Sequence, residues 1–256
     1  MTLVRRLTLR ACLLAAATLL AACQGAPGVL PTGPAAGPPL GLESALRLGE
    51  AAAAGGDMAS AVRIFESAVA SRPEAPEPRE ALADAYYRVG AYPEAGAAYR
   101  KLAAMRADSI AAQVGLGRVA LASGEAAAAE KHFRAALALD AQNPAALNGA
   151  AVSLDLRGRH REAQALYDAI LARDPVNRAV MTNRALSVAL GGDAAQAVRA
   201  LDDLARAPVR VPQAAHNLAL AYALAGQPKQ AEQILMAELP RGEARENLAF
   251  YRKLRK

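Results

Sequence analysis

The chain has 256 residues, of which 54% are apolar, only 4% are aromatic and none is tryptophan. Many of the apolar residues are alanine, which combines the highest helix propensity with little bulk, so the composition favours closely approaching helices. The formal net charge of +6 includes three arginines within the first ten residues, and the remaining excess of about +3 is too small for a nucleic-acid-binding surface.

Residues 1–22 have the pattern of an export signal. Arg5, Arg6 and Arg10 precede an apolar stretch over residues 11–20, an order that is typical of a secretory signal peptide. The stretch is too short for a membrane span, which needs about 20 apolar residues. Because both cysteines of the chain lie within the first 23 residues, a disulfide framework or a paired-cysteine metal site is excluded from the rest.

The signal ends in Leu20-Ala21-Ala22-Cys23, which resembles the lipobox of bacterial lipoproteins. The resemblance implies cleavage between Ala22 and Cys23, a diacylglyceryl group on the Cys23 thiol and an acyl group on the new amino terminus. No other cofactor is expected. Gln24 stands where an aspartate tends to retain such proteins at the inner membrane, so the resemblance implies an anchor in the outer membrane, on its periplasmic face. An ordinary signal with an incidental cysteine is the alternative.

Residues 23–41 are expected to form the acylated cysteine and a tether. The stretch from Gln24 to Gly41 contains five glycines and five prolines. Such a composition cannot hold a helix or bury a core, and it favours a partly extended chain that lifts the rest of the protein from the lipid surface.

A fixed period follows the tether. Glycine recurs at one constant spacing, at Gly56, Gly90, Gly124, Gly158, Gly192 and Gly226. Five residues after each glycine stands an alanine: Ala61, Ala95, Ala129, Ala163, Ala197 and Ala231. Nine residues after each glycine stands a large side chain: Phe65, Tyr99, Phe133, Tyr167, Leu201 and Leu235. Seven residues before it the side chain is always small: Gly49, Ala83, Gly117, Ala151, Ala185 and Ala219.

This pattern resembles the tetratricopeptide repeat (TPR) family, whose unit is a helix–turn–helix of about 34 residues. The resemblance covers residues 42–240 and implies an all-α solenoid of six repeats and twelve helices, wound as a right-handed superhelix with a concave inner face. The glycine suits the turn after each first helix, the small residues allow close approach, and the large side chain fills the gap toward the next repeat. Pro73 and Pro175 should end second helices, whereas Pro93 and Pro228 suit their first turns.

The tryptophan-type position of the family pattern, eleven residues before each glycine, has lost its aromatic side chain. It holds Ala45, Arg79, Gln113, Leu147, Met181 and Ala215. We expect the architecture to survive this loss because the period has no insertion or deletion, although individual packing details can differ.

Residues 241–256 follow the last repeat and contain apolar residues at Ala244, Leu248, Phe250, Tyr251 and Leu254. We expect a final helix that caps the open end of the stack. Four basic residues at its end, which suit a solvated capping face or contact with anionic lipid, are Arg252, Lys253, Arg255 and Lys256.

No catalytic constellation is evident. The three histidines, His132, His160 and His216, fall at different positions of different repeats, and no metalloprotease, phosphate-loop or nucleophile-elbow motif occurs. The sequence therefore predicts neither an enzyme nor a metal site. An enzyme of the cell wall, or a regulator of one, is the alternative that a hydrolase assay would test.

In the repeat family the first helices line the inner groove. Carrying these positions over to this chain gives a polar lining of Asp84, Tyr87, Arg88, Arg118, Asn148, Asp155, Thr182 and His216. We expect this lining to bind an extended peptide or a partner helix, and neither a small-molecule substrate nor nucleic acid. For each residue alone, plain solvated surface is the alternative.

The end of the chain carries a second resemblance. The run from Ala215 to Gly226, the segment KQAEQIL and the run from Glu246 to Arg255 resemble the TadD-like lipoproteins of the Flp (tight adherence, Tad) pilus assembly system. The resemblance implies a noncatalytic scaffold that assembles or positions the pilus secretion apparatus at the outer membrane, with the secretin or other assembly proteins as partners. Another interaction lipoprotein, such as a type IV pilus pilotin or an outer-membrane or cell-wall assembly factor, is the alternative.

Overall fold

The structure is a computed structural model that describes residues 41–206 and 211–254. The expected signal peptide, the acylated Cys23 and the tether up to Leu40 lie outside the described residues. The described chain divides into an N-terminal unit, residues 41–143, and a C-terminal unit, residues 144–254.

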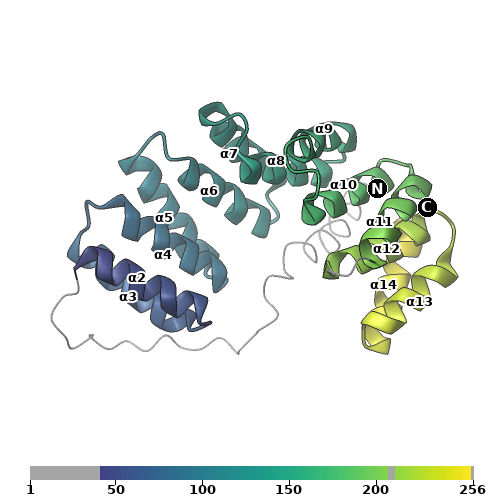
Figure 1. Cartoon of the computed structure of the whole chain (residues 1–256), viewed down its shortest axis with the longest axis horizontal. Helices are drawn as coiled ribbons and strands as arrows, with labels where there is room; N and C mark the ends of the chain where they lie inside the picture. Colours follow the sequence, from purple (N-terminus) through teal and green to yellow (C-terminus); the bar gives the residue numbers. More distant parts are fainter. Residues whose placement is uncertain (1–40, 207–210, 255–256) are drawn as a thin grey trace. The chain divides into compact units, whose positions relative to one another are not determined.

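The described residues of both units fold into helices, and none of them belongs to a strand (Figure 1). The N-terminal unit contains α2 (Leu42–Ala54), α3 (Met58–Ser71), α4 (Pro76–Arg88), α5 (Tyr92–Met105), α6 (Ile110–Ala122) and α7 (Ala126–Leu139). The C-terminal unit contains α8 (Pro144–Leu156), α9 (His160–Leu171), α10 (Arg178–Leu190), α11 (Ala194–Arg206), α12 (Pro212–Leu224), α13 (Pro228–Glu238) and α14 (Arg241–Leu254). The all-α class and the helix–turn–helix repeats are thereby confirmed.

Consecutive helices pack against each other within each unit. In the N-terminal unit α3 contacts α2 and α4, and α5 contacts α4 and α6. In the C-terminal unit α9 contacts α8 and α10, and α11 contacts α10 and α12. Each of these second helices therefore lies against the first helix of its own repeat and the first helix of the next.

The recurring glycine closes the turn inside every repeat. All six glycines have a positive φ, between 74° and 110°, which side chains with a Cβ adopt only at a cost of about 1–2 kcal/mol. At Gly90 the glycine N–H donates to the Tyr87 carbonyl (3.1 Å), and the next N–H, of Ala91, donates to the Tyr86 carbonyl (2.9 Å). These two bonds satisfy carbonyls at the end of α4, so the expected left-handed cap after the first helix is confirmed.

Prolines mark the second helices as expected at three of four places. Pro93 and Pro228 lie in the first turns of α5 and α13, where no intrahelical donor is lost. α3 ends at Ser71, shortly before Pro73. α9 already ends at Leu171, so Pro175 lies in the connection beyond a helix that has stopped without it.

The large side chain nine residues after each glycine is buried in every repeat. A Cβ on Gly49 would lie 2.3 Å from the ring of Phe65 in the second helix of the same repeat. A Cβ on Gly115 would lie 2.3 Å from the ring of Tyr99, which belongs to the preceding repeat. The large residue therefore packs against its own first helix and fills the gap toward the next repeat, as the pattern predicts.

The stretch after Pro240 forms α14, which packs against α12 and α13. Ala244, Leu248 and Tyr251 are buried in one apolar cluster with Leu220 and Leu235 of the sixth repeat. None of the helices that the described residues form is long and apolar enough to cross a membrane.

Candidate protein-binding surface

Three of the expected surface residues come together on α4 and α6, the first helices of repeats two and three. Asp84 and Arg118 hold the same position in these consecutive repeats. The Arg118 Nη1 atom lies 3.2 Å from Asp84 Oδ1, and the side chains are 37% and 49% exposed, respectively. An ion pair this exposed contributes at most about 1 kcal/mol, so its main effect is to position the guanidinium.

Tyr87 supplies an aromatic face for the same guanidinium. The Arg118 Cζ atom is 4.0 Å from the centre of the Tyr87 ring, and such a contact contributes about 0.5–1 kcal/mol at an exposed site. The ring centre of Tyr92, at the start of α5, lies 5.4 Å from that of Tyr87. The surface thus presents tyrosine and arginine together, the residue types that carry most binding energy at protein interfaces.

Tyr99 fixes this arrangement from the core. The hydroxyl of Tyr99 donates to Asp84 Oδ1 at 2.5 Å, while the ring is buried between α5 and its neighbours. Burial first, and the negative charge of Asp84 second, raise the pKa of Tyr99 far above its ordinary value. The hydroxyl therefore stays protonated and remains a hydrogen-bond donor to the carboxylate.

Glu80 belongs to the same surface and is not among the residues expected from the sequence. Burial first, and repulsion from Asp84 and Glu77, raise the pKa of Glu80 against the attraction of Arg106. Glu80, Asp84 and Tyr87 are spaced i, i+4 and i+7, which places them on one face of a helix. That spacing was the signal that could have identified Glu80. Tyr92 gave no comparable signal, because it lies on a second helix.

We find the other expected residues in separate surroundings. Arg88 is exposed at the end of α4 and donates from Nη2 to the Ala53 carbonyl of α2 (3.3 Å), so it reaches toward repeat one. In the C-terminal unit, Asn148 Oδ1 accepts a hydrogen bond from Asn183 Nδ2 (3.2 Å), and His216 is partly buried on α12.

Two of the expected surface residues are buried, and their placement on an open face was wrong. Thr182 is 1% exposed, and its hydroxyl donates to the Arg178 carbonyl one turn back in α10 (2.7 Å). Asp155 is 3% exposed because side chains of α9 and α10 cover it. Both residues therefore stabilise the C-terminal unit and present nothing to a partner.

Asp155 is the centre of a polar network that links α8, α9 and α10. Its Oδ1 accepts from the Ser187 hydroxyl (2.6 Å) and lies 2.9 Å from His160 Nδ1, while its Oδ2 accepts from the Tyr167 hydroxyl (3.1 Å). Burial first, and Asp155 second, raise the pKa of Tyr167 well above its ordinary value, so the hydroxyl remains a donor.

Although aspartate, histidine and serine meet here, they are not arranged for nucleophilic catalysis. A catalytic serine hydroxyl must bond to the histidine, which the aspartate orients from its other side. In this network the hydroxyl of the fully buried Ser187 donates to Asp155 itself. Among the residues that the structure describes, no group of three or more His, Cys, Asp or Glu side chains is arranged to hold a metal ion.

Comparison with known proteins gives a family and a fold. A sequence model of the tetratricopeptide repeat matches residues 52–117 and 120–182, about half of the chain. No curated protein sequence matches the chain.

Three solved structures illustrate the shared fold. A tetratricopeptide repeat protein from Parabacteroides merdae is 16% identical with a TM-score of 0.68, over 83% of this chain and 85% of that chain. PilW, a type IV pilus biogenesis factor, is 18% identical with a TM-score of 0.69, over 81% and 96%. Pseudomonas aeruginosa PilF is 13% identical with a TM-score of 0.62, over 77% and 89%. At these identities the likeness shows the fold alone.

Proposed function

The chain belongs to the tetratricopeptide repeat family, and on that premise we propose that it is a noncatalytic scaffold lipoprotein of the Flp/Tad pilus assembly apparatus. It is anchored to the periplasmic face of the outer membrane through lipid on Cys23. Its repeats bind a protein of the pilus secretion machinery, with the secretin as the first candidate.

The observation that carries the binding role is the surface formed by Asp84, Tyr87 and Arg118. A guanidinium held between a carboxylate (3.2 Å) and a tyrosine ring (4.0 Å) is already positioned before a partner arrives. Fixing a long side chain in advance lowers the entropy that binding must remove, which amounts to about 0.5–1.5 kcal/mol per immobilised side chain. Repeat proteins of this architecture use such surfaces to bind protein segments.

The proposed anchor rests on the sequence Leu20-Ala21-Ala22-Cys23 and on the proline- and glycine-rich segment that follows it. Three acyl chains, at about 0.8 kcal/mol per buried CH₂ group, hold a protein on a membrane stably, whereas a single chain is marginal. An anchor of this kind makes a spanning helix unnecessary.

The pilus assignment rests on the C-terminal run that includes Asn247, Leu248 and Tyr251. Leu248 and Tyr251 are core residues of α14, so part of this run is required to close the last repeat. PilW is described as a type IV pilus biogenesis factor, and its similar fold is compatible with the proposal without carrying it.

The experiment that tests the pilus assignment is deletion of the gene followed by imaging of Flp pili. We expect loss of pili and of adherence, with recovery when the wild-type chain is supplied. Normal piliation in the deletion strain contradicts the assignment. Mislocalised secretin with intact Flp pili would instead favour a pilotin of another pilus system.

A further inference from the structure

The tryptophan-type position is filled differently along the chain. In repeat two, Arg79 is buried: its Nε lies 3.1 Å from the Met105 sulfur at the end of α5, and its Nη2 donates to the Pro73 carbonyl (2.8 Å). In repeat three, Gln113 Oε1 lies 3.0 Å from His132 Nδ1 of α7. Long polar side chains thus occupy the space that the family gives to an aromatic ring.

Repeats four and five fill this position with apolar side chains. Leu147 is 7% exposed, and Met181 is partly buried against the apolar cluster around Leu201. Repeats one and six have only a methyl group at this position: Ala45 is 5% exposed, whereas Ala215 is only partly buried. A methyl group cannot replace the volume of the larger side chains, and because neighbouring residues do not cover Ala215 completely, a void is expected beside it.

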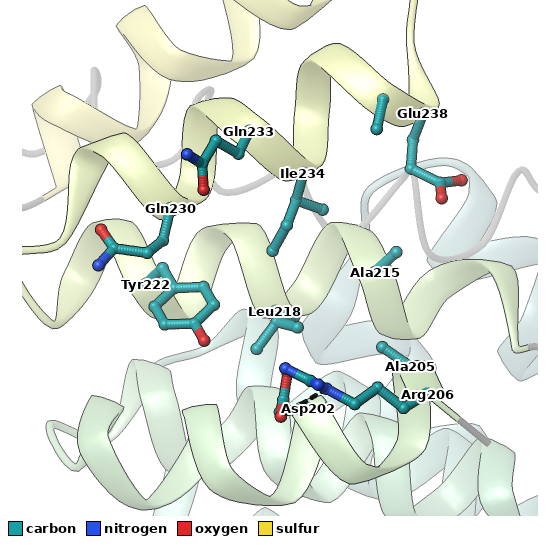
Figure 2. Close-up of a pocket in the computed structure, with 11 residues that line it drawn as sticks. Asp202, Ala205, Arg206, Ala215, Leu218, Tyr222, Gln230, Gln233, Ile234 and Glu238 are labelled. Atoms are coloured by element: carbon teal, nitrogen blue, oxygen red, sulfur yellow. Dashed lines mark ion pairs between the residues drawn. The ribbon is translucent and has the colours of Figure 1, made fainter.

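The structure has a pocket at this place, with a volume of about 340 Å³ (Figure 2). Residues of α11, α12 and α13 line it, so it lies entirely within the C-terminal unit. Leu218 and Ile234 join Ala215 in its apolar lining. Polar or charged groups of the lining come from Asp202, Arg206, Tyr222 and Glu238. By volume alone the pocket can accommodate an aromatic group larger than benzene, which fits an enclosed cavity of about 150 Å³.

We infer that this pocket binds a tryptophan side chain presented by a partner polypeptide, in the space that Ala215 leaves open. The lining is complementary to an indole, which has a weakly positive ring edge and one N–H donor but no acceptor. Arg206 bonds one carboxylate oxygen of Asp202 (Oδ2, 2.9 Å), and the second oxygen remains an acceptor for the indole N–H.

The residues at the mouth of the pocket favour a polypeptide ligand over a free aromatic molecule. Gln230 and Gln233 border the pocket from α13, and both are exposed. Their amides carry donors and acceptors that match the N–H and C=O groups of a peptide backbone, which would lie outside the pocket while the side chain enters it. This pocket belongs to the C-terminal unit, whereas the surface formed by Asp84, Tyr87 and Arg118 belongs to the N-terminal unit. The inference that the pocket binds tryptophan does not depend on the pilus assignment.

The test is titration of the full chain, purified in detergent, with a capped pentapeptide that carries a central tryptophan. We expect saturable shifts of the Ile234 methyl signals, with a dissociation constant of about 5 mM or tighter, as for a small ligand. Free indole should bind the same site no more tightly than the peptide. The corresponding pentapeptide with central alanine should cause no saturable shift.

Ala215→Trp fills the pocket from inside and should abolish this binding, whereas Ala249→Trp, at an exposed position of α14, should not change it. If Ala215→Trp fails to fold, Ala215→Leu, which copies Leu147, should weaken binding at least about tenfold. Peptide binding that persists unchanged in a folded Ala215 variant overturns the inference, as does the absence of saturable peptide binding to the wild-type chain. Indole binding that is tighter than peptide binding overturns the choice of a polypeptide.

Discussion

At the scale of single residues, the close contacts of the repeats decide which glycines are indispensable. Gly115 lies so close to Tyr99 that a Cβ would meet a ring atom at 2.3 Å. Gly96, on α5, has room: its Cβ would approach only the Arg100 side-chain end at 3.3 Å and Val119 at 3.5 Å. Both glycines are helical and differ mainly in their neighbours.

Gly115→Ala should therefore lower the free energy of unfolding by about 1–3 kcal/mol, because the Tyr99 ring must move out of a packed site. Gly96→Ala should be neutral or stabilise by up to about 1 kcal/mol, since alanine favours the helix. Urea unfolding of the two variants measures the difference. Equal changes in unfolding free energy for the two variants would show that contact with the Tyr99 ring does not limit the size of the side chain at position 115.

Glu80 gives a prediction about pH. Its pKa is raised in the folded state, so the fold binds the proton more tightly than the unfolded chain does. The ionised form therefore lowers stability at neutral pH, and this cost disappears as the pH falls below the ordinary pKa of a glutamate, about 4.3. Glu80→Gln should raise the urea midpoint at pH 7 and leave it unchanged at pH 3.

Glu94→Gln is the matched control. Glu94 is exposed in the first turn of α5, where a negative charge is favourable toward the helix dipole, and it does not contribute to the raised pKa of Glu80. Its removal should leave the midpoint at pH 7 unchanged or lower it. A higher midpoint at pH 7 for this control alone would refute the explanation given for Glu80.

At the scale of elements, two tyrosines at the same repeat position bond to aspartates in different surroundings. Tyr167 donates to Asp155, which is 3% exposed, and Tyr99 donates to Asp84, whose side chain is 49% exposed. Water can replace a lost donor at Asp84, whereas at Asp155 it cannot reach the carboxylate.

Tyr167→Phe should therefore cost about 1–3 kcal/mol of unfolding free energy, and Tyr99→Phe about 1 kcal/mol or less. Thermal and urea unfolding of both variants would check the ranking. If Tyr99→Phe proves the more damaging of the two, the burial of Asp155 is not what makes its hydrogen bonds important.

The 34-residue period predicted the helices and turns of the repeats well, but it predicted the exposed residues of the binding surface only in part. The glycine spacing and the small and large positions are properties of the backbone and of close packing, so they recur in every repeat and can be recognised without a structure. Burial of a polar residue depends on its particular neighbours. Tyr87 and Asp155 hold the same repeat position, yet Tyr87 is partly exposed and Asp155 is covered by Tyr167, Ser187 and His160.

The pocket beside Ala215 shows the same limit. Loss of the aromatic residue was visible in all six repeats, but Arg79 and Leu147 fill the space with unrelated chemistry. Side-chain size alone does not decide which repeat keeps a void, because Ala45 of repeat one is as small as Ala215 and yet buried; the packing of the neighbouring helices decides it. Period alone does not contain that information.

At the scale of the whole molecule, the proposal combines an anchor at Cys23 with repeats that hold a partner. Cys23→Ser should abolish incorporation of labelled lipid and release the protein from the membrane fraction, because the acyl chains supply the attachment. Cys12→Ser, in the expected signal peptide, should leave labelling intact. Lipid labelling that persists in Cys23→Ser would refute the anchor.

The central claim is that a protein partner binds the surface of Asp84, Tyr87 and Arg118. It is tested most directly by a photoreactive residue in place of Tyr92, whose ring centre lies 5.4 Å from that of Tyr87, activated in intact cells. We predict one major adduct, with an outer-membrane protein of the Flp pilus apparatus, that is lost when Arg118→Glu is added. The absence of a protein adduct, or an adduct that Arg118→Glu leaves unchanged, would contradict the claim.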